Sequence, residues 1–472
     1  MSNNVSKRRA FSLDALRGYA ILTMVLSGTI AGTLPLWNYH AQVPPNKGFD
    51  PTIFGITWVD LVFPFFLFAM GAAFPFSLGR KLKEGISRLR LSIDSVIRGL
   101  QLAFFAIFIQ HMYPWVLSST PTYSTWLTTL TAFFLLFPMF MRLPWKMPEW
   151  LRIVIKLAAY GAAVVMMLSV SYANERIFSL GFSNIIILVL ANMAIFGSIV
   201  YIFTANKPIV RIAILPFLMA ILFTRMDVTS DGWQKWLMYY SPLPWLYNMY
   251  YLKYLFIVIP GSIAGEYLLD WINKPNETVK SKDEIHTAWF TLVVSVGLVV
   301  LNLYGLFTRQ LVLNLFGTAA LLSVGYIVLK KSNTVNTCFW KQLFTAGAYL
   351  LMLGLFFESF EGGIRKDHST FSYYFVTSGL AFMALTAFSI MCDFFKWNKA
   401  TSFLVMSGQN PMIAYVGSSM VVGPILCIVG IWSYINMLNQ TAIEGLMRGL
   451  IITGLVTLIT MFFTKIKWFW RT

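Results

Sequence analysis

The chain has 472 residues, of which 57% are hydrophobic and only 12% are charged, and its formal net charge is +17. Soluble domains carry about 25% charged residues, so this composition excludes a chain of soluble domains. The positive charge lies in short loops between apolar runs, which is typical of a membrane protein and does not call for a nucleic-acid partner. The three cysteines lack the paired spacing of a disulfide framework or a zinc site, so no metal is expected.

The N-terminus is basic and leads into an apolar stretch that contains Asp14 and Arg17 and lacks a small-residue cleavage site. We therefore predict a retained first helix and not a signal peptide. Apolar segments of about 20 residues can each cross a bilayer as a helix. Such segments occur at 12–34, 56–79, 93–115, 123–141, 150–171, 184–204, 208–225, 247–271, 287–307, 310–329, 341–358, 370–392, 402–432 and 444–464.

These segments predict an all-α fold, a polytopic transmembrane bundle of about fourteen helices (range about 11–14) in a single domain over residues 1–472. The pairs at 184–225 and 287–329 are interpreted as additions to a core. With the N-terminus inside and the segments alternating, 24 of the 36 Lys and Arg residues fall in inside loops and seven in outside loops. This bias predicts cytoplasmic N- and C-termini. The inside set includes Lys7, Arg8, Arg9, Arg142, Lys146 and Lys280.

Histidine is the side chain best suited to taking and returning a proton near neutral pH. Three of the four histidines fall at the outer side in this topology, which fits either an outer site or a chance distribution. These are His40, His111 and His368, whereas His286 lies inside. His40 stands out, because it lies in the proline-restrained loop 35–55 beside Trp37 and Tyr39.

Asp60 follows Trp58 near the outer start of the second segment. A carboxylate that faces hydrocarbon is costly, so we expect Asp60 to face the bundle interior or a wet cavity. It could orient a histidine or bind a substrate amine. Equally, it could be a helix N-terminal carboxylate favoured by the helix dipole. Both interpretations stay open at this point.

Other polar residues lie within the apolar segments. Asp14 and Arg17 are three residues apart, so they share a helix face and are expected to pair. Lys253 and Glu266 are too far apart to pair with each other, so each needs a partner elsewhere. Asn410 precedes a proline, which should break the long helix there. The break indicates either a plain kink or a cavity beside the exposed backbone.

Three motifs occur in order: FSLDALRGYAILTMVL, GITWVDLVFPFFLFAMG and FLVMSGQNPMIAYVG, followed by the closing KIKWFWRT. Together they resemble the bacterial relatives of heparan-alpha-glucosaminide N-acetyltransferase, the YeiB-like, DUF5009-type transmembrane acetyltransferases. The likeness covers most of the chain, with 184–225 and 287–329 as the added helix pairs.

The resemblance implies that an acetyl group passes across the membrane from cytoplasmic acetyl-CoA to a terminal amino sugar. The catalytic histidine of that family lies in the loop that corresponds to the one holding His40. Asp60 would then orient His40 or the acceptor. Trp37, Trp58 and His368 are placed at the substrate.

On the inner side, Asp14, Arg17 and Asn410 are expected to hold acetyl-CoA, whose phosphates suit arginine forks. Acetyl-CoA is then the acetyl donor, and no metal is needed. The expected partners are the lipid bilayer and an amino-sugar or glycan acceptor, with no nucleic acid. The resemblance also implies a bacterial cytoplasmic (inner) membrane and allows a homodimer.

The chain departs from that family at two places, which leaves the acceptor open. Ser27 and Gly28 stand where the family often has an asparagine, and Ser418 stands where mammalian members have a histidine. An O-acyltransferase of a cell-surface polysaccharide is therefore an alternative. A transporter or flippase without a covalent step is the third hypothesis, because transporters use broken helices and midplane charges.

Overall fold

The computed structural model describes residues 10–45, 47–141, 147–225, 232–275 and 281–471. Within those residues the chain is helical and has no strand, apart from a single bridge between Met141 and Trp470. The predicted all-α fold is therefore confirmed. Six basic residues of the topology prediction lie outside the described residues: Lys7, Arg8, Arg9, Arg142, Lys146 and Lys280.

The helices of the first half are α1 (Phe11–Thr29), α2 (Trp58–Ala72), α3 (Arg80–Lys83), α4 (Arg88–His111), α5 (Pro114–Leu117), α6 (Tyr123–Phe140), α7 (Glu149–Ser169), α8 (Ile185–Asn192), α9 (Ser198–Thr204), α10 (Pro208–Phe223) and α11 (Trp233–Tyr239). Those of the second half are α12 (Leu255–Asn273), α13 (Lys282–Phe307), α14 (Leu311–Lys330), α15 (Val335–Phe360), α16 (Phe371–Phe388), α17 (Asn398–Gln409), α18 (Pro411–Gly417), α19 (Gly423–Ile428), α20 (Trp432–Asn436) and α21 (Ala442–Lys465). Single π-helical turns extend some of them, at Pro75–Gly79, Met193–Gly197, Ser389–Phe394 and Ser418–Val422, and 3-10 turns occur at Leu36–Asn38, Ala173–Glu175 and Met249–Tyr254.

Twelve helices of the described chain are long and apolar enough to cross a membrane. This number lies within the predicted range, and the chain is a polytopic integral membrane protein. The two expected segments outside the twelve are α10, which has 16 residues, and α1, which carries Asp14 and Arg17. α1 nevertheless packs against α2, α17 and α21, so it belongs to the bundle.

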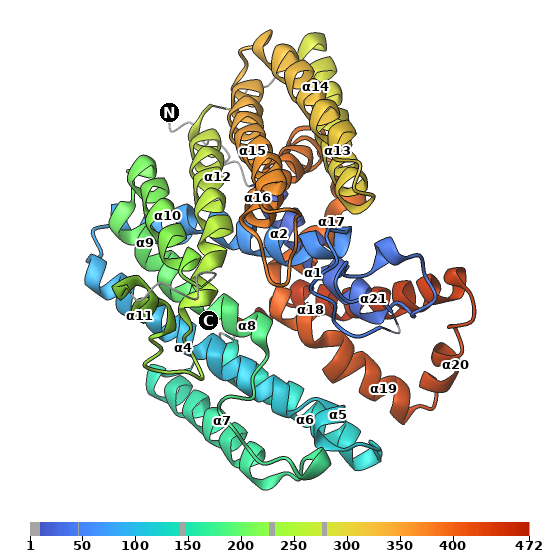
Figure 1. Ribbon diagram of the computed structural model, residues 1–472. Coiled ribbons are helices and arrows are strands. Elements are labelled where there is room, and N and C mark those ends of the chain that lie inside the picture. Colours follow the sequence, from blue (N-terminus) through green and yellow to red (C-terminus); the bar gives the residue numbers. More distant parts are fainter. Residues whose placement is uncertain (1–9, 46, 142–146, 226–231, 276–280, 472) are drawn as a thin grey trace.

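The helices form layers around α16. The span that contains α16 is 89% buried, whereas the span of α7 is only 17% buried. The exposed side chains of α7 include Leu157, Val165 and Leu168, as expected for a helix that faces lipid. In Figure 1, α13 and α14 lie at one edge and α6 and α7 at the opposite edge, with α1, α2 and α16 between them. The polar sites described below therefore lie in the middle layer.

Two helix pairs approach so closely that a larger residue would collide with backbone. A Cβ on Gly18 of α1 would overlap the Leu404 carbonyl of α17, and one on Gly408 of α17 would overlap the Asp14 carbonyl of α1. Gly71 of α2 meets the backbone of α12 in the same way. Small residues permit such close packing of membrane helices. These contacts place α1 and α2 firmly against α17 and α12.

The predicted helix break at Asn410 is confirmed, because α17 ends at Gln409 and α18 begins at Pro411. Asn410 is fully buried. Its side-chain amide donates to Trp468 O at 2.8 Å, and its side-chain oxygen accepts from Trp470 N at 3.4 Å. The break therefore serves to hold the C-terminal segment against the bundle.

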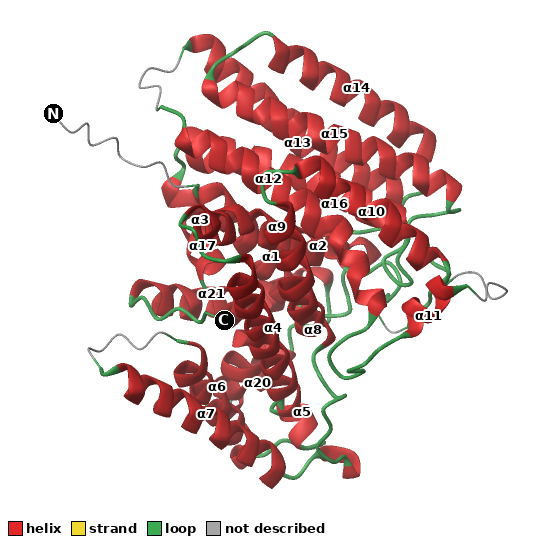
Figure 2. Cartoon of the chain, turned by 90° about the vertical axis from the view of Figure 1, so that its left-hand side faces the viewer, coloured by secondary structure: helices red, strands yellow, loops and turns green. Residues whose placement is uncertain are grey.

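Loop contacts divide the described chain into two sides that alternate along the sequence. On one side, Gly55 N donates to Ile364 O at 2.8 Å, which joins loop 30–57 to the loop before α16. On the other side, Phe11 N donates to the Asp393 carboxylate at 2.8 Å. Figure 2 shows α3 and α17 toward one side and α11 toward the other. That the side of α3 and α17 faces the cytoplasm stays a prediction from the basic loops.

Candidate active site

A buried carboxylate and a partly exposed histidine meet at the outer start of α2. Thr57 is the N-cap of this helix, and Asp60 lies in its first turn. Asp60 Oδ2 accepts hydrogen bonds from Thr57 N at 2.9 Å and from Thr57 Oγ1 at 3.3 Å. Asp60 Oδ1 lies 2.7 Å from His40 Nδ1. The same carboxylate thus caps the helix and orients the histidine, which joins the two roles that the sequence left open.

The hydrogen bond with Asp60 decides which ring nitrogen of His40 is free. An ionised carboxylate can only accept, so Nδ1 of His40 carries a proton and Nε2 presents a lone pair. The Asp60 side chain is fully buried, whereas the His40 side chain is 37% exposed. His40 can therefore act as a base or a nucleophile from a fixed orientation.

Lys366 brings a positive charge to this pair, and we call His40, Asp60 and Lys366 the histidine site. Lys366 Nζ lies 2.9 Å from His40 Nδ1, 3.2 Å from His40 Nε2 and 3.8 Å from Asp60 Oδ1. The two ring nitrogens point in diverging directions, so one ammonium near both lies against the ring. In the predicted topology, Lys366 is one of the seven basic residues of the outside loops, with no further role. The dense charge of loop 358–369 was the one available signal, because 326 residues separate Lys366 from His40.

α16 and the loops around it hold the histidine site in place. Tyr373 of α16 is fully buried, and its hydroxyl donates to Asp60 O at 2.8 Å. Thr57 Oγ1 donates to Tyr39 O at 2.7 Å, which ties the loop of His40 to the start of α2. Arg365 Nη1 donates to Pro51 O at 3.1 Å from the other loop. Three separate stretches of chain therefore fix the His40 side chain.

The other residues predicted at the substrate lie around this site at different depths. Trp58 is the half-buried first residue of α2, whereas Trp37 is 53% exposed in the turn before His40. His368 is exposed, and its ring lies 6.4 Å from that of Phe49. Within the described part of the chain, no hydrogen bond or ring contact joins Trp37, Trp58 or His368 to His40. Their predicted role at the substrate stays a prediction.

The remaining histidines have different surroundings. His111 is fully buried, its Nδ1 lies 2.8 Å from Ile107 O, and its Nε2 accepts from Ser179 N at 3.4 Å. Both ring nitrogens of His111 are therefore engaged in the helix packing. His286 is exposed at the start of α13, on the side opposite to His40.

A cavity of about 340 Å³, here called the inner cavity, lies among α1, α2, α4, α8 and α18. Three arginines line it: Arg17, Arg98 and Arg471. No acidic side chain is among its described lining residues, so the cavity favours an anionic ligand. Arg98 and Arg471 were not predicted, because only the fold shows that they face Arg17. Nowhere in the described residues do three His, Cys, Asp or Glu side chains gather as metal ligands.

Arg17 lines the inner cavity directly, and the other two residues predicted to hold acetyl-CoA act through neighbours. Arg17 Nη1 lies 3.5 Å from Asp14 Oδ1, so the predicted pair is confirmed. Arg17 Nη1 also donates to Gly408 O at 3.4 Å. Asp14 and Asn410 are not among the residues that line the cavity. Asn410, however, accepts a hydrogen bond from Trp470 N, and Trp470 lines the cavity. Asp14 and Asn410 therefore support the wall of the cavity.

One face of α2 leads from the inner cavity toward the histidine site. Phe63 and Ser77 both line the cavity, and Phe63 lies within one turn of Asp60. At 1.5 Å per residue, the stretch from Phe63 to Ser77 is about 21 Å long. The Phe63 ring lies 5.3 Å from that of Tyr254, which lies 5.8 Å from that of Tyr374. These three rings form an aromatic layer between the inner cavity and a pocket on the outer side that Tyr374 lines.

A comparison with models of protein families matches residues 9–268 to one family, described as a domain of unknown function, DUF5009. The match covers more than half of the chain. The chain belongs to the DUF5009 family. The curated proteins contain no match to it.

The DUF5009 match divides the histidine site. His40 and Asp60 lie within the matched residues, whereas Lys366 and Tyr373 lie beyond them. The match also includes 184–225, the first of the two helix pairs interpreted as additions, and ends before 287–329. In this DUF5009 protein the unmatched half therefore supplies the cation and the tyrosine that complete the site.

A separate pocket of about 290 Å³ lies beside the outer end of α1. Gly28 and Ser418, at which the chain departs from the acetyltransferase pattern, both line this pocket. Its other lining residues include three tryptophans, Trp115, Trp126 and Trp432. The two departures thus fall on one pocket, and His40 is not among its described lining residues.

Proposed function

We propose that this DUF5009 protein is a transmembrane acetyltransferase that passes an acetyl group from cytoplasmic acetyl-CoA to an amino sugar at the outer face. One observation carries the proposal: His40 is oriented by the buried carboxylate of Asp60, and Asp60 lies within one helical turn of Phe63, which lines the arginine-lined inner cavity. The resemblance of the motifs to bacterial relatives of heparan-alpha-glucosaminide N-acetyltransferase supports the same reaction. It also supports a place in a bacterial cytoplasmic membrane.

The inner cavity suits acetyl-CoA as the donor. Arg17, Arg98 and Arg471 supply positive charge for its phosphates, which arginine forks bind in bidentate geometry. The cavity then follows α2 and the π-helical turn after it for about 21 Å between Phe63 and Ser77. An extended pantetheine arm along this apolar wall would bring the thioester toward the outer half of the bundle.

The histidine site suits acyl transfer, in which a C–S bond breaks and a C–N bond forms. In one route, His40 Nε2 attacks the thioester carbonyl, CoA leaves as a thiolate, and the amine then displaces the histidine. In the other route, Nε2 takes the amine proton while the amine attacks the thioester. In both routes the proton of the amine ends on the CoA thiol. Lys366 lies where it can stabilise the oxyanion that forms on the carbonyl.

The first test is acetyl transfer by the purified protein in lipid nanodiscs, with radiolabelled acetyl-CoA and glucosamine. Wild-type protein should release free CoA and form N-acetylglucosamine. His40→Ala should lower this rate by about 100-fold or more, because a positioned acid or base contributes a factor of this order. His286→Ala is the matched control, because His286 is exposed on the opposite side, and it should leave the rate unchanged.

The same assay separates the alternatives. If the labelled product is an ester that base releases from a polysaccharide, the reaction is O-acetylation and not N-acetylation. Absence of CoA release with every amine and hydroxyl acceptor would reject the enzyme and favour a transporter. Activity that persists in His40→Ala would keep the acetyltransferase and reject His40 as its catalytic residue. Acetyl label that stays on the rapidly denatured wild-type protein, is released by neutral hydroxylamine and is absent from His40→Ala would distinguish the acetyl-histidine route from direct transfer.

A further inference from the structure

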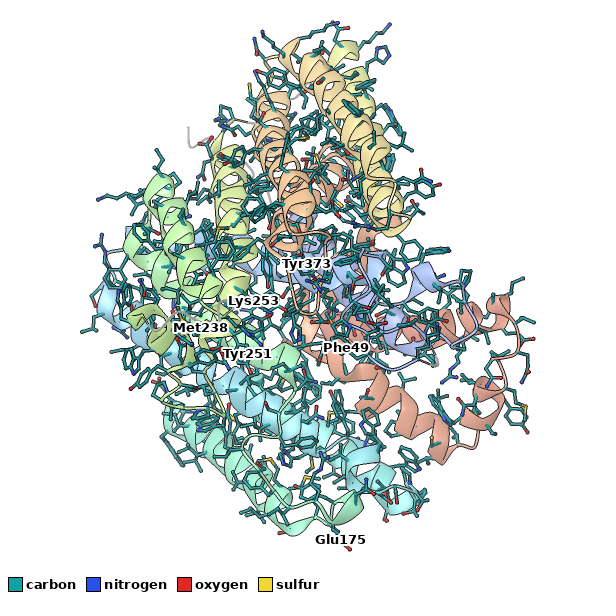
Figure 3. The ribbon with its side chains drawn as sticks, in the orientation of Figure 1. Phe49, Glu175, Met238, Tyr251, Lys253 and Tyr373 are labelled. Carbon is teal, nitrogen blue, oxygen red and sulfur yellow. The ribbon has the colours of Figure 1, made fainter. Side chains whose placement is uncertain are left out.

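The pocket on the outer side of the aromatic layer has a volume of about 300 Å³, and we call it the outer pocket. It lies between the end of α10, the turn Met249–Tyr254 and the start of α16. Its lining residues are Leu222, Arg225, Tyr250, Lys253, His368, Ser369, Phe371 and Tyr374. Three of these side chains are basic and none of the described ones is acidic. Figure 3 shows Lys253 near the middle of the molecule, close to Tyr373 and Phe49 in that view.

Lys253 is the buried cation of the outer pocket. Only 7% of this residue is exposed, and its Nζ donates to Ser369 Oγ at 2.7 Å. The Nζ atom also lies 3.5 Å from the centre of the Tyr250 ring. No carboxylate of the described residues comes within 4 Å of it, although Asp367 is close enough to act on it electrostatically. An ammonium group buried in a membrane protein needs compensation, and a hydroxyl and a ring compensate it only in part.

A second cation shares the Tyr250 ring. The guanidinium carbon of Arg225 lies 3.7 Å from the centre of this ring, on which Lys253 also packs. Arg225 is exposed at the rim of the pocket, as is His368. Two cations held so close to one ring repel each other, and a bound anion would relieve that repulsion. The combination of a buried ammonium, a guanidinium and hydroxyl donors matches the chemistry of an oxyanion.

The outer pocket adjoins the histidine site through one loop. Lys366, which contacts His40, is two residues from His368, so their Cα atoms are at most about 7 Å apart. Phe49, from the loop that holds His40, contacts the His368 ring. Tyr374 lines the outer pocket and belongs to the aromatic layer that covers the inner cavity. The loop that lines the outer pocket with His368 and Ser369 therefore also carries the lysine that contacts His40.

We propose that the outer pocket binds an oxyanion, a phosphate or a carboxylate, that the acceptor carries at some distance from its amine. The acceptor is then an anionic amino sugar, and Lys253 is the residue that selects it. This inference rests on the proposed function, because the ligand is an acceptor only if the protein transfers an acetyl group to it. The binding of an oxyanion at Lys253 does not depend on acetyl transfer, so the two can fail separately.

The test measures binding of glucosamine 6-phosphate and of glucosamine to the nanodisc protein by calorimetry, without acetyl-CoA. Lys253→Met keeps the apolar stem and removes the charge, and it should weaken the sugar phosphate by about tenfold or more, as expected for a charge-assisted hydrogen bond. Binding of neutral glucosamine should not change. Lys47→Met is the matched control, because Lys47 is exposed on the outer loop, and it should bind the phosphate as wild type does.

Size-exclusion chromatography checks the fold of Lys253→Met. If that variant does not elute as a single peak, Arg225→Gln at the exposed rim replaces it, and the same selective loss for the phosphate is expected. Equal binding of both sugars, or equal weakening of both by the variants, would overturn the proposal.

A lipid headgroup is the other source of a phosphate, and a second arm separates it. Nanodiscs of phosphatidylglycerol and of phosphatidylcholine are compared by thermal denaturation of wild type and Lys253→Met. If phosphatidylglycerol raises Tm only in wild type and no sugar phosphate binds, the ligand is a lipid and the acceptor site is overturned. If acetyl transfer fails but Lys253-dependent sugar-phosphate binding persists, the pocket stands and the proposed reaction falls. Acetyl transfer to glucosamine and to glucosamine 6-phosphate at equal rates would support the proposed reaction. It would reject the outer pocket as the site that selects the acceptor.

Discussion

The Asp60 carboxylate links the local backbone of α2 to the reactivity of His40. Its Oδ2 is occupied by Thr57 and so secures the first turn of the helix, which leaves Oδ1 for the histidine. Because the helix cap fixes the carboxylate, the carboxylate can fix the imidazole. The consequence is that a small change at Asp60 should affect catalysis more than folding.

We expect Asp60→Asn to lower kcat for acetyl transfer by about 100-fold or more, because an amide no longer selects the His40 tautomer with a free Nε2. The KM for acetyl-CoA should stay the same, since the inner cavity is untouched. Steady-state kinetics in nanodiscs measures both constants. Asp50→Asn is the control, because the exposed Asp50 carboxylate accepts hydrogen bonds from Thr52 in the same loop. Unchanged kcat in Asp60→Asn would contradict the assigned role of Asp60.

At the scale of helices, α1 connects the inner cavity to the rest of the bundle. It presents Arg17 to the cavity on one side and packs its Gly18 against the α17 backbone on the other. The partner glycine, Gly408, lies just before the break at Asn410. Close packing against α17 therefore positions α1, and the break that follows Gln409 brings α18 to the same cavity.

Gly408→Ala should push α1 and α17 apart, because the added Cβ would overlap the Asp14 carbonyl. We expect the free energy of unfolding to fall by about 1–3 kcal/mol, the usual cost of overpacking. Thermal denaturation in detergent, followed by intrinsic tryptophan fluorescence, measures the change. Gly161→Ala on α7 is the control, since nothing lies within 4 Å of its added Cβ. Equal Tm values for both variants would argue against the packing role of Gly408.

At the scale of the whole molecule, the aromatic layer of Phe63, Tyr254 and Tyr374 reaches from the wall of a basic inner cavity to the wall of a basic outer pocket. In the proposed reaction, such a layer would keep water from the thioester until an acceptor is bound. The helices cross the membrane many times. The side on which each loop lies therefore also decides from which face each substrate of the proposed reaction enters.

Tyr254→Ala should open the aromatic layer and let water reach acetyl-CoA. The expected result is a severalfold increase in CoA release in the absence of any acceptor, with less acetyl transfer per CoA released. A thiol-reactive dye follows CoA release. Tyr304→Ala is the control, because Tyr304 is 51% exposed on α13. If the hydrolysis rate does not rise, the aromatic layer is not the barrier to water.

The predicted orientation has its own test. Lys47→Cys should react with a membrane-impermeant maleimide added to intact cells, because loop 30–57 is predicted to face outward. Lys399→Cys should react only after the membrane is permeabilised, since the start of α17 is predicted to face the cytoplasm. Mass spectrometry measures the labelled fraction in a background with the three native cysteines replaced. The reverse pattern would invert the topology and the direction of acetyl transfer.

The sequence predicted correctly those features that depend on residues close to one another in the chain. The apolar segments predicted the helices, the proline predicted the break after Asn410, and the spacing of Asp14 and Arg17 predicted their pair. Lys253 and Glu266 were expected to have partners elsewhere, and they do, in Ser369 and in Arg211 respectively. Arg211 belongs to the basic residues that the topology places in inside loops, but it is buried within the bundle. It donates to Thr204 of α9 and to Ser262 and Glu266 of α12, and the α12 partners are more than 50 residues away.

By itself, the sequence determined that the chain is a helical membrane protein, because hydropathy and segment length are sums over neighbouring residues. It also singled out His40 and Asp60, since one loop and the helix start that follows it contain both. Only the tertiary structure decided that Lys366 completes this pair, that Arg98 and Arg471 join Arg17, and that Lys253 faces a basic pocket. These contacts join residues from distant helices. Helix packing creates these contacts, and the order of residues along the chain does not show how the helices pack.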